Sequence, residues 1–142
     1  MNQQQEVTTR VSTAGIARKG ERYLVALRKP GTSIGESWEF PGGKQQSSET
    51  PQETLKREYQ EEFSVEIVVG DFLYTDYFQN RNHQYRLEVY EVQLISESFV
   101  LREHQAIRWV HLKDLKHMPM APSDRTILRF LERRWEEAES DQ

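Results

Sequence analysis

The start of a helix is the feature of this sequence that most constrains its fold, because a few residues define both the position and the direction of the helix. Thr50 suits the N-cap, Pro51 the first helical position and Glu53 the third, which together form a capping box. The helix should therefore begin at Pro51 and run to about Glu62.

Alternating apolar and polar residues predict strands on both sides of this helix. Residues 11–29 contain two such runs around the polar turn Lys19–Arg22, which indicates a hairpin. The remaining strands are expected over residues 38–40, 65–78, 85–95 and 106–112.

The C-terminal segment has the spacing of an amphipathic helix. Ile127, Leu128, Leu131 and Trp135 recur at helical intervals, and Ser123 suits the N-cap. With the strands, this predicts an α/β class fold, a mixed sheet with helices packed on it. We expect one domain over residues 1–142, with residues 1–8 and 137–142 flexible.

Composition excludes several classes of function. The 142 residues include no cysteine, so there is no disulfide, thiolate nucleophile or cysteine metal site. The net charge of -4 argues against nucleic-acid polymers as partners. No run approaches the roughly 20 apolar residues of a membrane span, and the N-terminus lacks the apolar core of a signal peptide. We therefore expect a cytoplasmic protein without a membrane partner.

Three glutamates crowd one turn of the first helix. Glu58, Glu61 and Glu62 fall within an arc of roughly 100°, beside Leu55 and Tyr59, which should anchor the helix to the sheet. Repulsion between such carboxylates is relieved by a divalent cation, and oxygen ligands favour Mg²⁺, or Mn²⁺, in phosphate chemistry. The alternative is an ordinary surface helix rich in Glu and Lys.

The bend before this helix adds to the metal interpretation. Gly42 and Gly43 let the backbone approach a metal or phosphate closely, and Lys44 adds a positive charge.

The spacing across these segments resembles the Nudix box. From Gly43, five residues lead to Glu49 and seven more to Arg57, followed by EYQEEFSV at residues 58–65. Tyr59 stands where a smaller aliphatic residue is usual, which should alter packing but not ligation. Ser64 replaces a glycine expected in a left-handed conformation, at a cost of roughly 1 to 2 kcal/mol.

The flanking WEFPGGK resembles the MutT-like branch of the family. The resemblance implies an α/β/α sandwich around a mixed sheet, and hydrolysis of nucleoside triphosphates to the monophosphate and pyrophosphate. It also implies that Arg57 orients a glutamate and that Glu49 braces the loop against the helix. The metal ligands implied are the Gly43 carbonyl with Glu58, Glu61, Glu62 and Glu103.

Glu103 is placed where MutT-like enzymes have a further carboxylate, with Glu97 as a rival. The resemblance leaves either Glu62 or Glu103 as the general base. Among the catalytic candidates we also count Arg57 and Lys44.

The resemblance also implies where the nucleotide binds. Asp124 occupies the place that reads the nucleobase, although an acid in a first helical turn is also favoured by the helix dipole. An ionised Asp only accepts hydrogen bonds, which suits the amino group of cytosine, or a guanine edge. Phe40 offers a stacking face or belongs to the core, and Arg28 offers a phosphate or ribose contact or is a solvated strand end.

Residues of the second expected hairpin complete the candidates. We expect Phe78 and Arg81, with Tyr77 and Arg86, to line the far side of a nucleotide cleft, unless the aromatic rings serve sheet packing. The four histidines lack metal-ligand spacing and receive no role.

Two other functions stay open. The first is hydrolysis of nucleotide sugars of the ADP-ribose type, and the second is a non-catalytic nucleotide-binding module. A monomer is expected, with a dimer left open.

Overall fold

The computed structural model describes residues 9–30 and 36–140, with side chains as far as residue 138. Within these ranges seven strands form a mixed sheet in the order β3-β2-β1-β6-β5, with β4 paired to β1 and β7 paired to β2. The strands are β1 (Arg10–Lys19), β2 (Arg22–Arg28), β3 (Trp38–Glu39), β4 (Gly42–Lys44), β5 (Ile67–Asn80), β6 (His83–Leu94) and β7 (His104–His111).

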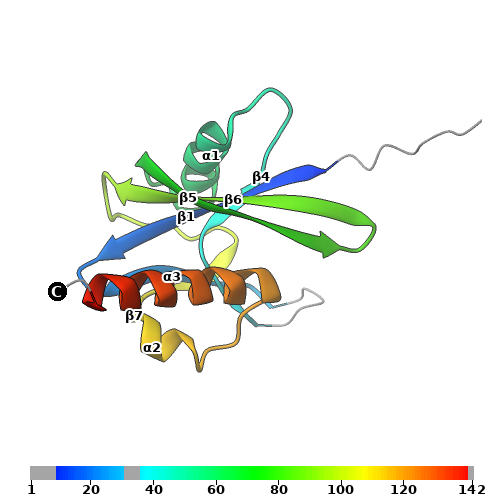
Figure 1. Ribbon diagram of the computed structural model, residues 1–142. Coiled ribbons are helices and arrows are strands. Elements are labelled where there is room, and N and C mark those ends of the chain that lie inside the picture. The colour runs from blue at the N-terminus through cyan, green and yellow to red at the C-terminus, as the bar shows by residue number, and fades with distance from the viewer. Residues whose placement is uncertain (1–8, 31–35, 141–142) are drawn as a thin grey trace, which may run out of the picture.

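Helices cover both faces of this sheet. They are α1 (Pro51–Phe63), α2 (Leu112–Leu115) and α3 (Pro122–Ser140). Helix α1 lies on one face of the part formed by β1, β6 and β5, and α3 lies on the opposite face (Figure 1). This is the α/β/α sandwich expected from the sequence.

Strand β1 joins two parts of the sheet: β6 and β5 lie on one side of it, and β2, β3 and β7 lie on the other. The sequence did not predict this arrangement. It pairs antiparallel with β2 only at Arg18↔Tyr23 and Lys19↔Arg22. Before that point it runs parallel to β6 and antiparallel to β4, while β2 continues along β7. The predicted hairpin is therefore confirmed only next to its turn.

Helix α1 begins where the capping box predicted. The Thr50 hydroxyl accepts a hydrogen bond from the Glu53 amide at 3.1 Å, and the Glu53 carboxylate accepts one from the Thr50 amide at 3.0 Å. The helix ends at Phe63, and Ser64 follows in the left-handed conformation with φ 55° and ψ 38°. Ser64 thus adopts the conformation that the family pattern assigns to glycine.

Helix α3 begins at Pro122, two residues before the start at Asp124 that Ser123 as N-cap implied, so Ser123 lies in its first turn. A flexible end was expected from residue 137. The helix instead continues to Ser140, because no Gly or Pro interrupts it. Residues 1–8 and 141–142, also expected to be flexible, lie outside the described residues.

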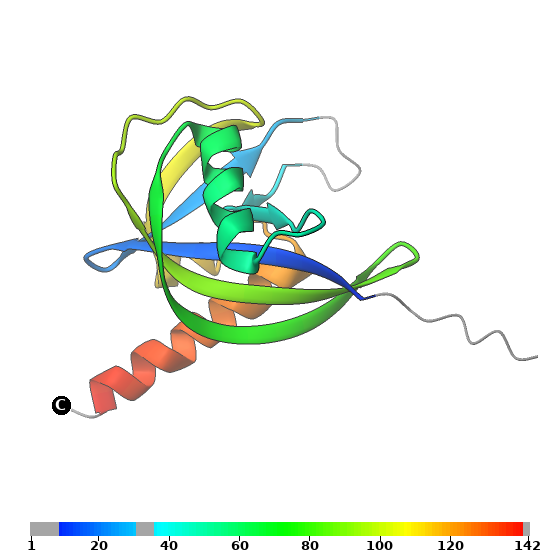
Figure 2. The same cartoon turned by 90° about the horizontal axis from the view of Figure 1, so that it is seen from above.

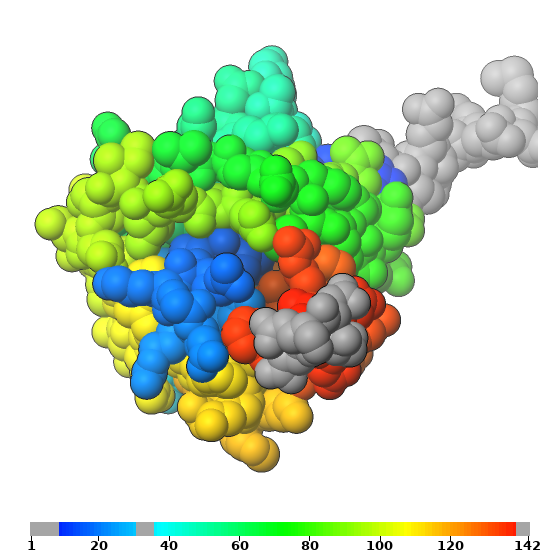
Figure 3. Space-filling view, turned by 60° about the vertical axis from the view of Figure 1, so that its left-hand side comes forward, coloured from blue at the N-terminus to red at the C-terminus, as the bar shows by residue number. Residues whose placement is uncertain are grey.

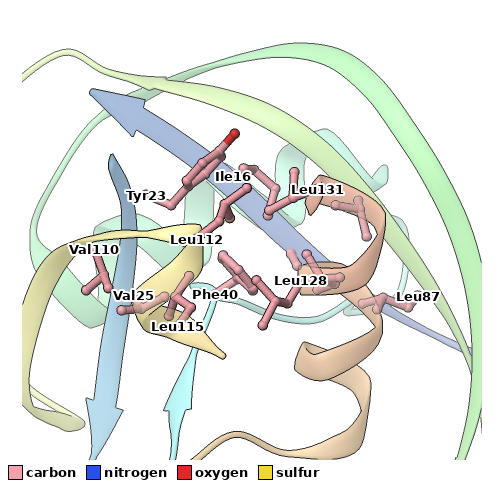
Figure 4. Close-up of a cluster of buried hydrophobic side chains, with 13 residues drawn as sticks. Ile16, Tyr23, Val25, Phe40, Leu87, Val110, Leu112, Leu115, Leu128 and Leu131 are labelled. Atoms are coloured by element: carbon pink, nitrogen blue, oxygen red, sulfur yellow. The ribbon is translucent and has the colours of Figure 1, made fainter. Parts of the chain in front are cut away.

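Two hydrophobic clusters hold the layers together. Under α3, the buried side chains of Ile127, Leu128 and Leu131 meet those of β1, β2 and α2 (Figure 4). Under α1, Leu55, Tyr59 and Phe63 pack on the opposite side of the sheet. Figure 2 shows α1 and α3 separated by the curved strands. Of the two clusters, the one under α3 also borders the cavity described below, through Phe40, Leu87 and Ile127.

Short elements escaped the sequence patterns. Strand β4 and helix α2 have only three and four residues, too few for a period to be visible. Strand β7 begins at His104, two residues before the predicted start at 106. None of the described helices combines the length and apolar character that crossing a membrane requires.

Candidate active site

Glu58, Glu61 and Glu62 form an acidic turn on α1. The side chain of Arg57 makes most of the hydrogen bonds around this turn. Its guanidinium binds both oxygens of Glu49, at 2.6 and 3.1 Å. It also donates to Glu58 at 2.7 Å, to Glu61 at 3.1 Å and to the Lys44 carbonyl at 3.0 Å. Arg57 thus binds three glutamates, where the sequence predicted that it orients one, and the carboxylates of Glu49 and Glu58 raise the pKa of Arg57.

Glu49 braces the loop against the helix, as predicted. Its carboxylate accepts hydrogen bonds from the Gln46 amide at 2.9 Å and from the Thr54 hydroxyl at 3.1 Å, in addition to Arg57. The Arg57 hydrogen bonds, followed by that from Gln46, lower the pKa of Glu49 to about 2. This carboxylate is therefore engaged in the structure rather than open to a ligand.

Glu62 points away from Arg57 into the protein. It is only 3% exposed, and its Oε2 atom is buried with no partner among the described residues. Burial, and then the charges of Glu58, Glu39 and Glu103, raise the pKa of Glu62 to about 9. A buried oxygen without a partner is an unsatisfied acceptor that a cation or a proton would satisfy.

The expected convergence of three carboxylates is only partly present. Arg57 supplies the positive charge for Glu58 and Glu61, whereas Glu62 lies on the inner side. Across residues 9–30 and 36–140, no three acidic or histidine side chains form a ready-made metal cage. The donors are nonetheless carboxylates with one orphaned oxygen, a set that fits a hard divalent cation.

Gly42 and Gly43 allow the close backbone approach that the sequence suggested. A Cβ atom on Gly42 would lie 2.0 Å from the Thr13 carbonyl oxygen, and one on Gly43 would lie 2.3 Å from Cδ of Glu58. The Thr13 hydroxyl donates to the Gly43 carbonyl at 2.9 Å. Strand β4 therefore places Gly43 directly beside Glu58.

Glu103 lies near Glu62, whereas its rival Glu97 does not join the site. The amide next to Glu103, that of Arg102, donates to the Glu62 carbonyl at 3.3 Å, and the charge of Glu103 contributes to the raised pKa of Glu62. Glu97 instead forms an ion pair with Lys19 at 2.7 Å. The arrangement therefore favours Glu103 as the additional carboxylate.

A cavity of about 330 Å³ opens beside the acidic turn. Its walls include five of the candidates named from the sequence besides Gly43: Arg28, Phe40, Lys44, Phe78 and Asp124. Arg81 is not part of the lining, because it occupies the β5–β6 turn with φ 56° and is exposed. Its neighbour Asn80 lines the cavity instead.

Asp124 faces this cavity from the first turn of α3. Its Oδ1 atom accepts a hydrogen bond from the Phe40 amide at 3.0 Å, and no described residue binds the other oxygen. Burial raises the pKa of Asp124 to about 7, against the lowering effect of the Phe40 amide. The carboxyl group therefore exchanges its proton near neutral pH.

The aromatic candidates mostly serve packing. Phe40 is 4% exposed and belongs to the cluster under α3, so only part of its ring borders the cavity. Phe78 stacks on Tyr85 with ring centroids 5.0 Å apart, and Tyr77 is 60% exposed. Lys44 lies over the Tyr85 ring, 5.3 Å from its centroid. Of these, Phe78 and Lys44 present the more accessible surface to the cavity.

Thr13 and Glu39 are among the wall residues that were not predicted from the sequence. Glu39 pairs with Arg28 and lies 3.3 Å from Nε2 of the buried His104. Glu39 directly precedes the candidate Phe40 in the motif WEFPGGK, so this motif could have indicated Glu39 as well. Thr13 carried none, because its contact with Gly43 depends on pairing between distant strands.

A second, larger hollow of about 430 Å³ lies away from this site. It is bordered by the end of β1 and by the middle and C-terminal part of α3, which lie side by side in Figure 3. Glu97 and Lys19 are in its wall, and none of the main candidates is.

Comparisons with known proteins agree with this architecture. Over 115 residues the chain is 28% identical to the CTP pyrophosphohydrolase of Escherichia coli (strain K12), with 81% of this chain and 85% of the relative covered. It is 37% identical to the 8-oxo-dGTP diphosphatase of Proteus vulgaris over 57 residues, which is 40% of this chain and 51% of the relative.

Solved structures resemble it over most of their length. The ORF135 protein of E. coli superposes with a TM-score of 0.76 at 25% identity, covering 87% of this chain and 89% of that chain. The MutT protein from Methanosarcina mazei Go1 gives 0.77 at 24% identity, covering 94% and 97%. The family model of the NUDIX domain matches residues 8–131. The chain therefore belongs to the Nudix hydrolase family.

Proposed function

We propose that this protein is a Mg²⁺-dependent pyrophosphohydrolase, with Mn²⁺ as a substitute, that cuts nucleoside triphosphates to the monophosphate and pyrophosphate. The observation that carries the proposal is the placement of the acidic turn. The glutamates around Arg57 and the unpartnered oxygen of Glu62 lie next to a cavity that holds Asp124.

The Gly43 carbonyl and four carboxylates would hold the cation, namely those of Glu58, Glu61, Glu62 and Glu103. A divalent cation bound there supplies charge neutralisation for the phosphates and lowers the pKa of a water molecule. Arg57 keeps Glu58 and Glu61 on the ligand side of the helix, and Thr13 holds the Gly43 carbonyl in place.

The proton of the attacking water would pass to Glu62 or Glu103. Because both carboxylates would also hold the cation, their Gln variants are compared at saturating Mg²⁺, where loss of the general base lowers kcat by roughly 10²- to 10⁴-fold.

The position of Asp124 supports reading of the nucleobase. Its free oxygen would accept a hydrogen bond from the amino group of cytosine when the carboxyl is ionised, and would donate one when it is protonated. The similarity to a CTP pyrophosphohydrolase supports CTP or dCTP as substrate. The similarity to 8-oxo-dGTP diphosphatases supports an oxidised purine nucleotide as the second candidate.

The test is pyrophosphate release from CTP, dCTP, methylated dCTP and 8-oxo-dGTP, with and without Mg²⁺, alongside ADP-ribose. Glu61→Gln is the active-site variant, because Glu61 is exposed and its loss should not unfold the chain. Glu66→Gln, also on the surface and just after α1, is the matched control.

The expected result is Mg²⁺-dependent pyrophosphate release that falls strongly in Glu61→Gln and not in Glu66→Gln. Cleavage of ADP-ribose alone would replace the proposal with a nucleotide-sugar hydrolase. Tight nucleotide binding without turnover would indicate a binding module.

A further inference from the structure

The buried histidine His104 contacts both α1, which carries the acidic turn, and β3, which borders the cavity. It is the first residue of β7 and is 2% exposed. Its ring stacks on Phe63, the last residue of α1, with centroids 5.1 Å apart and planes at 21°. The Nε2 atom lies 3.3 Å from Oε2 of Glu39, and no described residue binds Nδ1.

Glu39 is shared between this histidine and an arginine. One carboxylate oxygen faces His104, and the other accepts a hydrogen bond from Nε of Arg28. Burial opposes ionisation of Glu39, but the His104 hydrogen bond and the Arg28 charge prevail, so its pKa is lowered. Glu39 is therefore a fixed anion with both oxygens engaged.

This contact leaves the outer part of Arg28 available. Only Nε is used, and no described residue binds the two terminal nitrogens. The side chain is 45% exposed and lines the cavity beside Gly43 and Lys44. An arginine held at Nε presents its two terminal nitrogens in a fixed direction, which suits a phosphate or ribose oxygen.

The backbone around His104 is tied to the same arginine. The Gln105 side chain donates to the Arg28 carbonyl at 2.9 Å, and the Lys29 amide donates to the Glu103 carbonyl at 3.4 Å. The segment that carries Glu103 and the strand end that carries Arg28 are thus joined on both sides of His104.

We propose that His104 is a positioning residue, which fixes the Glu39 carboxylate and through it directs the Arg28 guanidinium toward the phosphates or ribose of the bound nucleotide. The identity of the ligand rests on the proposed function. A residue that served packing alone would be apolar here, because a buried ring nitrogen without a partner is costly. The hydrogen bond to Glu39 accounts for the histidine.

Two substitutions separate the ring from its hydrogen bond. His104→Phe keeps an aromatic ring against Phe63 and removes the bond to Glu39. His104→Gln keeps a donor and removes the ring. Each is made in the wild type and in Arg28→Ala, with thermal unfolding as the check on folding.

The first readout needs no turnover. Calorimetric titration with a non-hydrolysable CTP analogue should show affinity reduced about 10-fold by His104→Phe and less by His104→Gln. In the Arg28→Ala background His104→Phe should change affinity less than about twofold, because coupled residues are not additive.

The second readout needs no ligand. The ¹H–¹⁵N resonance of Arg28 Nε should be protected from solvent exchange in the wild type and lose that protection in His104→Phe. An unchanged resonance, or an equal loss of affinity in both backgrounds, would overturn the positioning role.

The two proposals fail separately. If the analogue binds with the expected His104 dependence but no triphosphate is hydrolysed, the proposed function is wrong and the positioning role stands. If triphosphates are hydrolysed and His104→Phe leaves KM, affinity and the Arg28 resonance unchanged, the reverse holds.

Discussion

The hydroxyl group of Tyr59 on α1 donates a hydrogen bond to the backbone carbonyl of Gly15 on β1, at 3.0 Å. The contact is buried, and a Cβ atom on Gly15 would lie 3.0 Å from the Tyr59 ring. Tyr59 replaces the smaller aliphatic residue usual at this position. The larger ring fits because the strand beneath it has no side chain there.

Gly15→Ala should lower the free energy of unfolding by about 1–3 kcal/mol, because the added methyl group overpacks the space between Tyr59 and Val92. The loss should be smaller in a Tyr59→Leu background, which makes room on one side. Urea unfolding of the four proteins in this cycle measures the coupling. Equal losses in both backgrounds would show that Tyr59 does not set the need for glycine.

Ser64 holds a left-handed conformation, and its hydroxyl accepts a hydrogen bond from Arg102 at 2.8 Å. Ser64→Gly should therefore be about 1 kcal/mol more stable than Ser64→Ala, since both lose the hydroxyl and only glycine adopts φ 55° freely. Chemical denaturation of the pair gives the difference directly. Equal stability would mean that residue 64 is not left-handed in solution.

Gly42 and Gly43 should respond differently to alanine. A methyl group on Gly42 meets the backbone of Thr13 and Ala14, which cannot move aside, so Gly42→Ala should fail to fold or lose several kcal/mol. A methyl group on Gly43 meets only the Glu58 side chain, which can shift. Gly43→Ala should therefore fold.

The cost of Gly43→Ala should appear in the metal site instead. Because Glu58 is displaced, we expect Mn²⁺ affinity, measured by titration calorimetry, to fall by about 10-fold or more. A stable Gly42→Ala, or a Gly43→Ala with unchanged Mn²⁺ binding, would contradict this division.

The buried carboxyl group of Asp124 should make stability depend on pH. Its pKa rises from 3.8 to about 7 on folding, so between these values the unfolded chain loses a proton that the folded chain keeps. Stability from this group is fully present below about pH 4 and is lost as the pH approaches 7, by at most about 4 kcal/mol.

Asp124→Asn cannot ionise, so it should gain stability relative to the wild type as the pH rises over this range. Urea unfolding at pH 4.5 and pH 8 measures the change in the difference. Parallel pH profiles for the two proteins would show that Asp124 titrates as an exposed acid.

Local signals made much of the fold predictable. The start of α1 follows from Thr50 and Glu53, which are three residues apart, and its C-terminal neighbour Ser64 from the family pattern. The partners of β1 were not predictable, because alternation identifies a strand but not its neighbour. Arg10 pairs with Tyr85, and nothing near either residue encodes that choice.

The candidate site was likewise predictable only where its signals are local in the sequence. The spacing within one helix pointed to Glu58, Glu61 and Glu62, and the motif pointed to Glu103. The chain from His104 through Glu39 to Arg28 joins β7, β3 and β2, so only the folded sheet reveals it. The burial of Glu62 was also not predictable, because helical spacing gives the angular position of a side chain on the helix but not the residues that cover it.

The parallel pairing of β1 with β6 has a consequence during synthesis. The N-terminal strand emerges first, yet most of its backbone partners lie in residues 85–92. Until these leave the ribosome, β1 has only the three pairs with β4 and the two with β2. Such long-range closure is slow. We therefore expect nascent chains that stop before β6 to remain open to proteases and chaperones.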